Sequence, residues 1–182
     1  MKRFVYAVLM LVAIAFASCK EKSDFEKYND SNFKLANYSK IQGVYSMKGA
    51  ERALSYFGLD PAIWTGSDPC AEFLPQRNVL RMRSGLKGTD VEIRIINLIG
   101  DELYFSANGK VARAQLTFNE NGNLSEFDIH KLGEAEPETT LGYGQGVANS
   151  DPGEFEECLK RHEEIDRNTE IEDANSKGVG PH

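Results

Sequence analysis

Residues 78–131 alternate apolar and charged side chains in a series of short segments that are separated by tight turns. In the segment 91–95, for example, valine and isoleucine alternate with glutamate and arginine. Asn108-Gly109 joins two such segments, and this dipeptide favours a two-residue hairpin turn. A period of two gives each strand one apolar and one charged face, which is typical of an antiparallel sheet with one wet side. The sequence therefore predicts a β-meander.

A strand and a helix are predicted before this meander. Residues 41–47 alternate well enough for a first strand, and residues 48–57 place apolar side chains at helical spacing, with Gly58 as a stop signal. The fold class that we expect is therefore α+β. It consists of an antiparallel β-meander, as a curled sheet or small barrel, with short N-terminal helices and one C-terminal helix.

Three Asp-Pro pairs indicate further helix starts, because aspartate suits the N-cap and proline the first helical position. Two of them predict single helical turns, around Trp64 and around Cys70. The third begins a predicted helix over 152–166, whose apolar stripe contains Cys158 and has His162 at its edge.

The remaining segments suggest connections and ends. Residues 133–150 are predicted as a glycine-rich loop, and residues after Arg167 carry almost no apolar content and are predicted to be disordered. We therefore expect a signal peptide over 1–18, a tether over 19–39 with room at its end for a helical turn packed on the domain, one α+β domain over 40–167, and a disordered tail over 168–182.

The start of the chain has the pattern of an export signal. Lys2 and Arg3 precede an apolar run over 4–17, which is shorter than the about 20 residues that a transmembrane helix needs. A basic start, a short apolar core and small residues before a cut site are typical of secretory signals. The run ends in Phe16-Ala17-Ser18-Cys19, which resembles the bacterial lipobox at its last three residues; Phe16 stands where that motif usually has an aliphatic residue.

This resemblance implies that Cys19 is the lipidation site, acylated with chains such as palmitate, and that the protein is anchored in the bacterial cell envelope. Two or more acyl chains anchor a protein stably where one does not. Lys20, in place of aspartate, implies the outer membrane rather than the inner one. The alternative is an ordinary secretory signal with an incidental cysteine.

The other two cysteines form an even pair if Cys19 carries lipid. Because the envelope outside the cytoplasm is oxidising, we expect Cys70 and Cys158 to form a disulfide bond. The alternative is a pair of buried free thiols. No Cys-x-x-Cys motif or nearby histidine pattern is present, so no metal site and no cofactor are predicted.

Three candidates for binding chemistry remain, each beside a plainer interpretation. Asp128 and His130 share one face of a predicted strand and suit a metal or acid–base group, but also a solvated strand face. Trp64 suits a pocket lining or core packing. Tyr143 lies in a glycine-rich stretch that suits a mobile binding loop or a simple connection.

Charge and the absence of a catalytic motif limit the classes of function that the sequence supports. The net charge of −7, without a large cluster of Lys and Arg, argues against a nucleic-acid partner. No catalytic constellation is evident, so we expect a non-enzymatic binding or scaffold module in the envelope, with the membrane and a protein as its partners. One alternative is an inhibitor or immunity-type lipoprotein against a toxin or wall hydrolase, because an acidic domain suits a basic target.

The other alternative is a small lipid carrier. Gly43-Val44-Tyr45 is similar to the Gly-x-Trp opening of lipocalins, with tyrosine in place of tryptophan. This resemblance implies a barrel around a ligand cavity. A deep apolar cavity would favour the carrier, whereas a flat exposed aromatic patch or a projecting acidic loop would favour the binding or inhibitor class.

Overall fold

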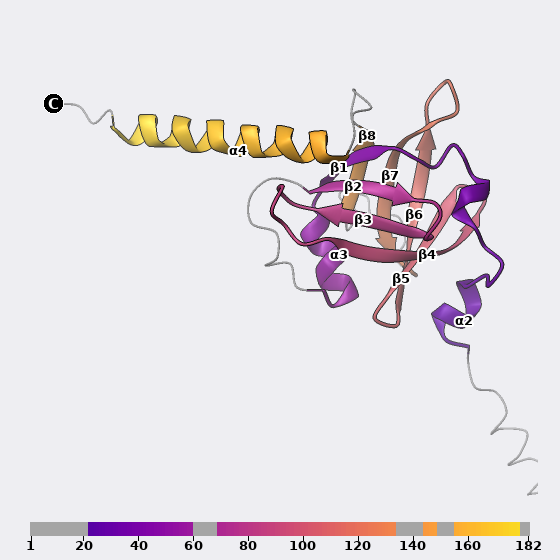
Figure 1. The fold of residues 1–182 in the computed structure, drawn as a ribbon. Coiled ribbons are helices and arrows are strands. Elements are labelled where there is room, and N and C mark those ends of the chain that lie inside the picture. Colours follow the sequence, from indigo (N-terminus) through magenta and orange to yellow (C-terminus); the bar gives the residue numbers. More distant parts are fainter. Residues whose placement is uncertain (1–21, 60–68, 134–143, 149–154, 179–182) are drawn as a thin grey trace, which may run out of the picture.

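A closed antiparallel barrel forms the body of the protein in the computed structural model (Figure 1), which describes residues 22–59, 69–133, 144–148 and 155–178. Its strands follow one another around the barrel in chain order, and the last pairs with the first. They are β1 Val44–Lys48, β2 Cys70–Leu74, β3 Val79–Arg83, β4 Val91–Ile99, β5 Glu102–Ala107, β6 Lys110–Phe118, β7 Leu124–Lys131 and β8 Gly144–Ala148. The predicted fold class, an antiparallel meander with short helices before it and one after it, is confirmed.

Side chains from the barrel's own strands form a contiguous apolar core inside it. An eight-stranded barrel is just wide enough for side chains to fill, and here alternate residues of the strands point inward and are buried. Tyr45, Phe73 and Phe127 meet edge to face, with ring centres 5.2–5.5 Å apart. The Tyr45 hydroxyl donates to the backbone oxygen of Gln42 at 2.7 Å, so its polar end is satisfied within the core.

Helix α3, Ala50–Phe57, adds its apolar face to this core. Ala50, Ala53, Leu54 and Phe57 are fully buried, which follows from their helical spacing in the sequence. The helix stops at Gly58, which adopts the left-handed conformation with φ 70°, as predicted from the glycine. The hairpin turn at Asn108-Gly109 is also confirmed, because both residues have positive φ, 49° and 75°.

The N-terminal segment packs on the barrel over much of the predicted tether. Helix α2, Asp24–Tyr28, begins with a capping box at Ser23, and Tyr28 stacks on Tyr104 of β5 with ring centres 4.6 Å apart. A short 3-10 helix follows at Leu35–Asn37, and Leu35 is fully buried. Within the stretch predicted as a tether over 19–39, aromatic and aliphatic side chains therefore pack on the barrel, in keeping with the packed helical turn that the prediction included.

The two segments that pair with β1 differ from their predicted structure. Cys70 begins β2 rather than lying in a helical turn, because its backbone pairs with β1 and β3 on both sides. Residues 144–148, predicted as part of a loop, form β8 and close the barrel between β1 and β7. Glycine has no side chain, so this segment shows no apolar–polar alternation that would predict a strand. Its backbone N–H and C=O groups can still pair with the neighbouring strands.

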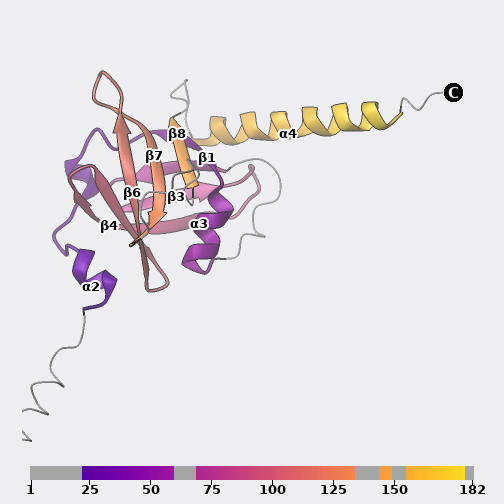
Figure 2. The ribbon, with the colours of Figure 1, turned by 180° about the vertical axis from the view of Figure 1, so that it is seen from behind.

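Helix α4, Phe155–Gly178, projects away from the barrel and touches it near its N-terminal end, beside β1 and β2 (Figures 1 and 2). Its 24 residues correspond to about 36 Å. The helix continues beyond Arg167, into the stretch predicted as a disordered tail, because no proline or glycine interrupts it before Gly178. In the described parts of the chain, no helix has both the length and the apolar character needed to cross a bilayer.

Candidate functional site

The junction between α4 and the barrel contains a disulfide, a buried histidine and several arginine–carboxylate pairs. Cys70 of β2 and Cys158 of α4 form a disulfide pair across this junction, with Cα atoms 6.1 Å apart and a sequence separation of 88. The sequence predicted this pairing. Both cysteines are buried, together with Phe155 and Leu159 from the first turns of α4, in a small apolar cluster separate from the barrel core. The pair therefore links the base of α4 covalently to the barrel.

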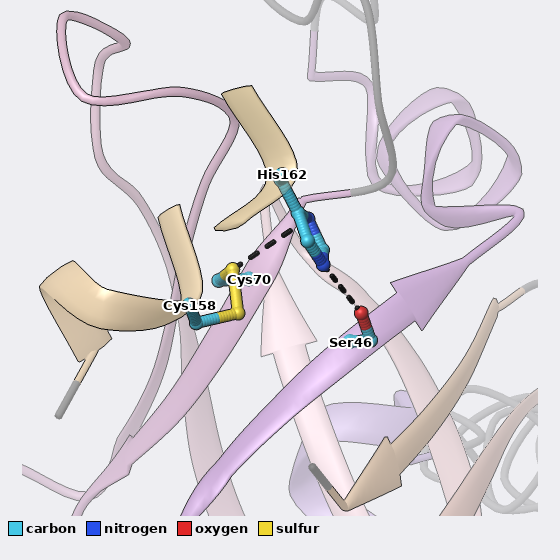
Figure 3. The surroundings of a disulfide bond; sticks show 4 residues. All are labelled: Ser46, Cys70, Cys158 and His162. Carbon is cyan, nitrogen blue, oxygen red and sulfur yellow. Dashed lines mark hydrogen bonds between the residues drawn. A yellow bond between two sulfur atoms is a disulfide. The ribbon is translucent and has the colours of Figure 1, made fainter. Parts of the chain in front are cut away.

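His162 lies directly beside this disulfide. It is one helical turn after Cys158, so both side chains face the barrel. Its Nδ1 is 3.7 Å from Sγ of Cys70, and its Nε2 is 2.8 Å from Oγ of Ser46 on β1. Figure 3 shows the imidazole held between the sulfur pair and the hydroxyl. The imidazole is buried, with 8% of its surface exposed.

The sequence analysis did not identify this cluster as a site, although the sequence contains a signal for its two helical residues. Cys158 and His162 stand four residues apart on a predicted apolar stripe, which places them on one helix face. Cys70 and Ser46 come from strands far away in the chain, and their proximity depends on the closure of the barrel. Cys70, Cys158 and His162 each offer a potential metal ligand, and these atoms lie within 4.8 Å of one another.

Arginines on β3 hold the start of α4. Arg83 donates from Nε to Asp90 at 2.6 Å and pairs with Glu156 of α4 at 3.2 Å. The hydrogen bond from Arg83 lowers the pKa of Asp90 below its ordinary value. The guanidinium groups of Arg81 and Arg83 also lie over the ring of Phe155, at 4.2 and 5.5 Å from its centre.

A polar cleft of about 420 Å³ lies between the β3–β4 loop and α4. Glu163 of α4 fixes one wall, because its Oε1 accepts a hydrogen bond from the backbone N–H of Leu86 at 2.7 Å. The residues that line the cleft are Ser84, Gly85, Lys87, Gly88, Thr89, Glu163 and Asp166.

Helix α4 carries more carboxylates than basic groups, and its described residues from Glu164 onward are mostly exposed. Among the α4 positions whose side chains the structure describes, six are carboxylates and three are Lys or Arg. Ile165 and Ile171 are about half exposed on the same part of the helix. A helix that is polar on most of its circumference and projects into solvent suits bridging to another molecule.

Asp128 and His130 lie together on the outward face of β7, as the sequence predicted, with buried Ile129 between them pointing inward. Burial raises the pKa of Asp128, the nearby carboxylate of Glu126 raises it further, and His130 lowers it. Within the described residues, Oδ1 of Asp128 is buried and makes no hydrogen bond. Trp64, Tyr143 and Cys19, the other candidates, lie outside the described residues.

Comparison with protein-family models, with curated proteins and with solved structures finds no match to this chain.

Proposed function

We propose that this protein is a lipid-anchored, non-catalytic binding module of the bacterial envelope, in which the barrel is a scaffold and α4 docks a basic protein partner. The observation that carries this proposal is the contrast between the two parts. The barrel interior is occupied by its own aromatic and aliphatic side chains, whereas α4 extends into solvent with an excess of carboxylates (Figure 1).

The apolar core inside the barrel favours a binding module over a lipid carrier. A carrier of this architecture holds its ligand inside the barrel, in a cavity of a few hundred Å³. Here Tyr45, Phe105 and Phe127 are among the large side chains that fill the inside, and each is at most 1% exposed. Opening a cavity of that size would require these rings to leave a close-packed cluster.

The attachment of α4 supports a docking role. A helix that is polar on most of its circumference has little apolar packing to stabilise it. Helix α4 is nevertheless fixed at its base by the Cys70–Cys158 pair, the Phe155 contacts and the Arg83–Glu156 ion pair. A helix that is pre-ordered in this way loses less conformational entropy on binding. Its carboxylates favour a basic surface through electrostatic complementarity, which raises the association rate.

The inhibitor or immunity-type function is the specific form of this proposal that the acidic helix favours. A toxin or wall hydrolase with a basic surface would meet the carboxylates of α4, and the lipid on Cys19 would hold the inhibitor at the membrane where such a target acts. The segment before α2 is the link between that anchor and the barrel.

A site-specific crosslinking experiment tests the docking role. The mature chain with Cys19→Ser, carrying a photo-crosslinking residue at exposed Arg167 of α4, is expressed in the envelope of its host. The matched control carries the residue at Ile99, which is half exposed at the β4–β5 turn of the barrel. We expect one basic protein to crosslink from α4 and not from Ile99, and charge reversal by Glu164→Lys and Glu172→Lys to abolish the crosslink.

Two results would contradict the proposal. Crosslinks of equal yield from α4 and from Ile99, or a crosslink that persists after charge reversal, would separate the partner from the acidic helix. The Cys19→Ser protein lacks the proposed acylation site. A stoichiometric lipid that co-purifies with it would therefore favour the carrier.

A further inference from the structure

We infer that Cys70, Cys158 and His162 form a Cys2His binding site for a zinc ion when the disulfide is reduced. The three side chains converge from β2 and from two consecutive turns of α4 (Figure 3). All three are buried, and their potential ligand atoms lie within 4.8 Å of one another. Thiolate sulfur and imidazole nitrogen are the ligands that zinc prefers in proteins.

The distance between one pair of ligand atoms already matches that in tetrahedral zinc sites. With Zn–S about 2.3 Å and Zn–N about 2.0–2.1 Å, two such ligands of one tetrahedral ion are about 3.6 Å apart. Nδ1 of His162 is already 3.7 Å from Sγ of Cys70. The two sulfurs must separate to about 3.8 Å once their bond is broken.

Ser46 supplies an outer partner of the kind that metal-binding histidines use. In zinc sites the second ring nitrogen of the histidine donates to an oxygen, which fixes the tautomer and the ring plane. Nε2 of His162 is 2.8 Å from Oγ of Ser46, so the same contact can orient Nδ1 toward the sulfurs. The three protein ligands leave a fourth zinc position for water or for a ligand from outside.

The chemistry couples zinc binding to a thiol reductant. A dithiol transfers two electrons and two protons to the disulfide, becomes a disulfide itself and leaves Cys70 and Cys158 as two thiols. Zinc then displaces one proton from each thiol and binds the two thiolates and Nδ1 of His162. Exchange with a disulfide oxidant, which takes up the two electrons and becomes a dithiol, restores the Cys70–Cys158 bond and releases the ion, so the site distinguishes reducing from oxidising conditions.

Metal titration of the mature chain with Cys19→Ser tests this inference. A phosphine reductant cleaves the disulfide, taking up oxygen from water as phosphine oxide, and is then removed under argon. Cobalt(II) serves as the spectroscopic probe, because its thiolate charge-transfer and tetrahedral d–d absorptions report the ligand set. Competition with zinc gives the zinc affinity. We expect one ion per chain in the reduced protein and none in the oxidised protein.

Variants separate the site from incidental thiol binding. We expect His162→Gln to weaken zinc binding by more than about 100-fold and Ser46→Ala by about 10- to 100-fold, the range for outer partners of a ligand. His130→Gln, on the outward face of β7, is the matched control and should bind as the parent does.

Folding is monitored in the same samples by near-ultraviolet circular dichroism. If the reduced protein loses its tertiary signal without metal, zinc should restore it in the parent and not in His162→Gln. Three results would overturn the inference: a reduced, folded protein that binds no cobalt; binding that His162→Gln leaves unchanged; or a reduced, unfolded protein whose signal zinc does not restore.

Discussion

The guanidinium carbon of Arg81 lies 4.2 Å from the centre of the Phe155 ring, so a side chain of the barrel wall covers the first residue of the projecting helix. Phe155 also packs in the apolar cluster around the disulfide and is 4% exposed. The position of α4 therefore depends on one aromatic ring as well as on the covalent link.

Replacing this ring should loosen the base of α4. We expect Phe155→Ala to lower the free energy of unfolding by about 3 kcal/mol, because it removes a buried aromatic side chain and its cation–π contacts. Urea denaturation measures the change. Ile171→Ala, on the exposed part of the same helix, is the control and should stay within about 0.5 kcal/mol of the parent. Equal effects of the two substitutions would contradict this account of the junction.

Asn78 joins the N-terminal segment to the barrel and was not singled out by the sequence. Its Oδ1 accepts from the N–H of Leu35 at 2.8 Å, and its Nδ2 donates to the backbone oxygen of Phe33 at 3.1 Å. Its backbone has a positive φ of 51°, which asparagine tolerates better than most residues.

We expect Asn78→Ala to cost about 2 kcal/mol or more, from two lost hydrogen bonds at about 1 kcal/mol each and from an unfavourable backbone conformation. Asn78→Gly keeps the backbone conformation accessible and loses the hydrogen bonds, so it should cost less than Asn78→Ala. Thermal unfolding of both variants, beside Asn121→Ala in an exposed turn, measures the two contributions. A loss in Asn121→Ala as large as in Asn78→Ala would argue against this role.

The sequence predicts the parts of this fold that rest on side-chain patterns. The alternation in β3, β4, β6 and β7 and the Asn108-Gly109 turn are local signals, and the structure confirms them. The closing strand β8 is not predictable in this way, because Gly144 and Gly146 carry no pattern and their pairing depends on two strands that are distant in sequence. The candidate site is also only partly predictable from the sequence. The pairing of Cys70 with Cys158 is predicted because two cysteines remain once Cys19 is assigned to lipid. The approach of Ser46 and Cys70 to His162 is not predictable, because it requires a closed barrel.

Asp128 should make stability depend on pH. Its pKa is raised in the folded state by burial and by Glu126, so the folded protein binds more protons than the unfolded chain as the pH passes between the two pKa values. Stability therefore falls as the pH rises through this window. We expect Asp128→Asn to raise the melting temperature at neutral pH and to have little effect below the unfolded pKa of about 3.9.

Asp90 provides a comparison of opposite sign. Its pKa is lowered in the folded state by the hydrogen bond from Arg83, so it stabilises the fold above its unfolded pKa, and this contribution is lost as the pH falls through the folded pKa. Asp90→Asn should therefore lower the melting temperature at neutral pH, and the difference from the parent should shrink in acid. If both variants shift the melting temperature in the same direction at neutral pH, the electrostatic assignment of at least one of these carboxylates is wrong.

The proposed anchor at Cys19 gives a prediction that is independent of the barrel. If the resemblance of Ala17-Ser18-Cys19 to a lipobox is functional, cells fed with labelled palmitate should incorporate the label into this protein and retain it in the membrane fraction. Cys19→Ser should remove the label and release the protein, because a short apolar signal without acyl chains does not hold a protein stably. Cys158→Ser, which removes a cysteine without touching the signal, should keep the label. Incorporation that survives Cys19→Ser, or a mature N-terminus other than residue 19 by mass spectrometry, would favour an ordinary secretory signal with an incidental cysteine.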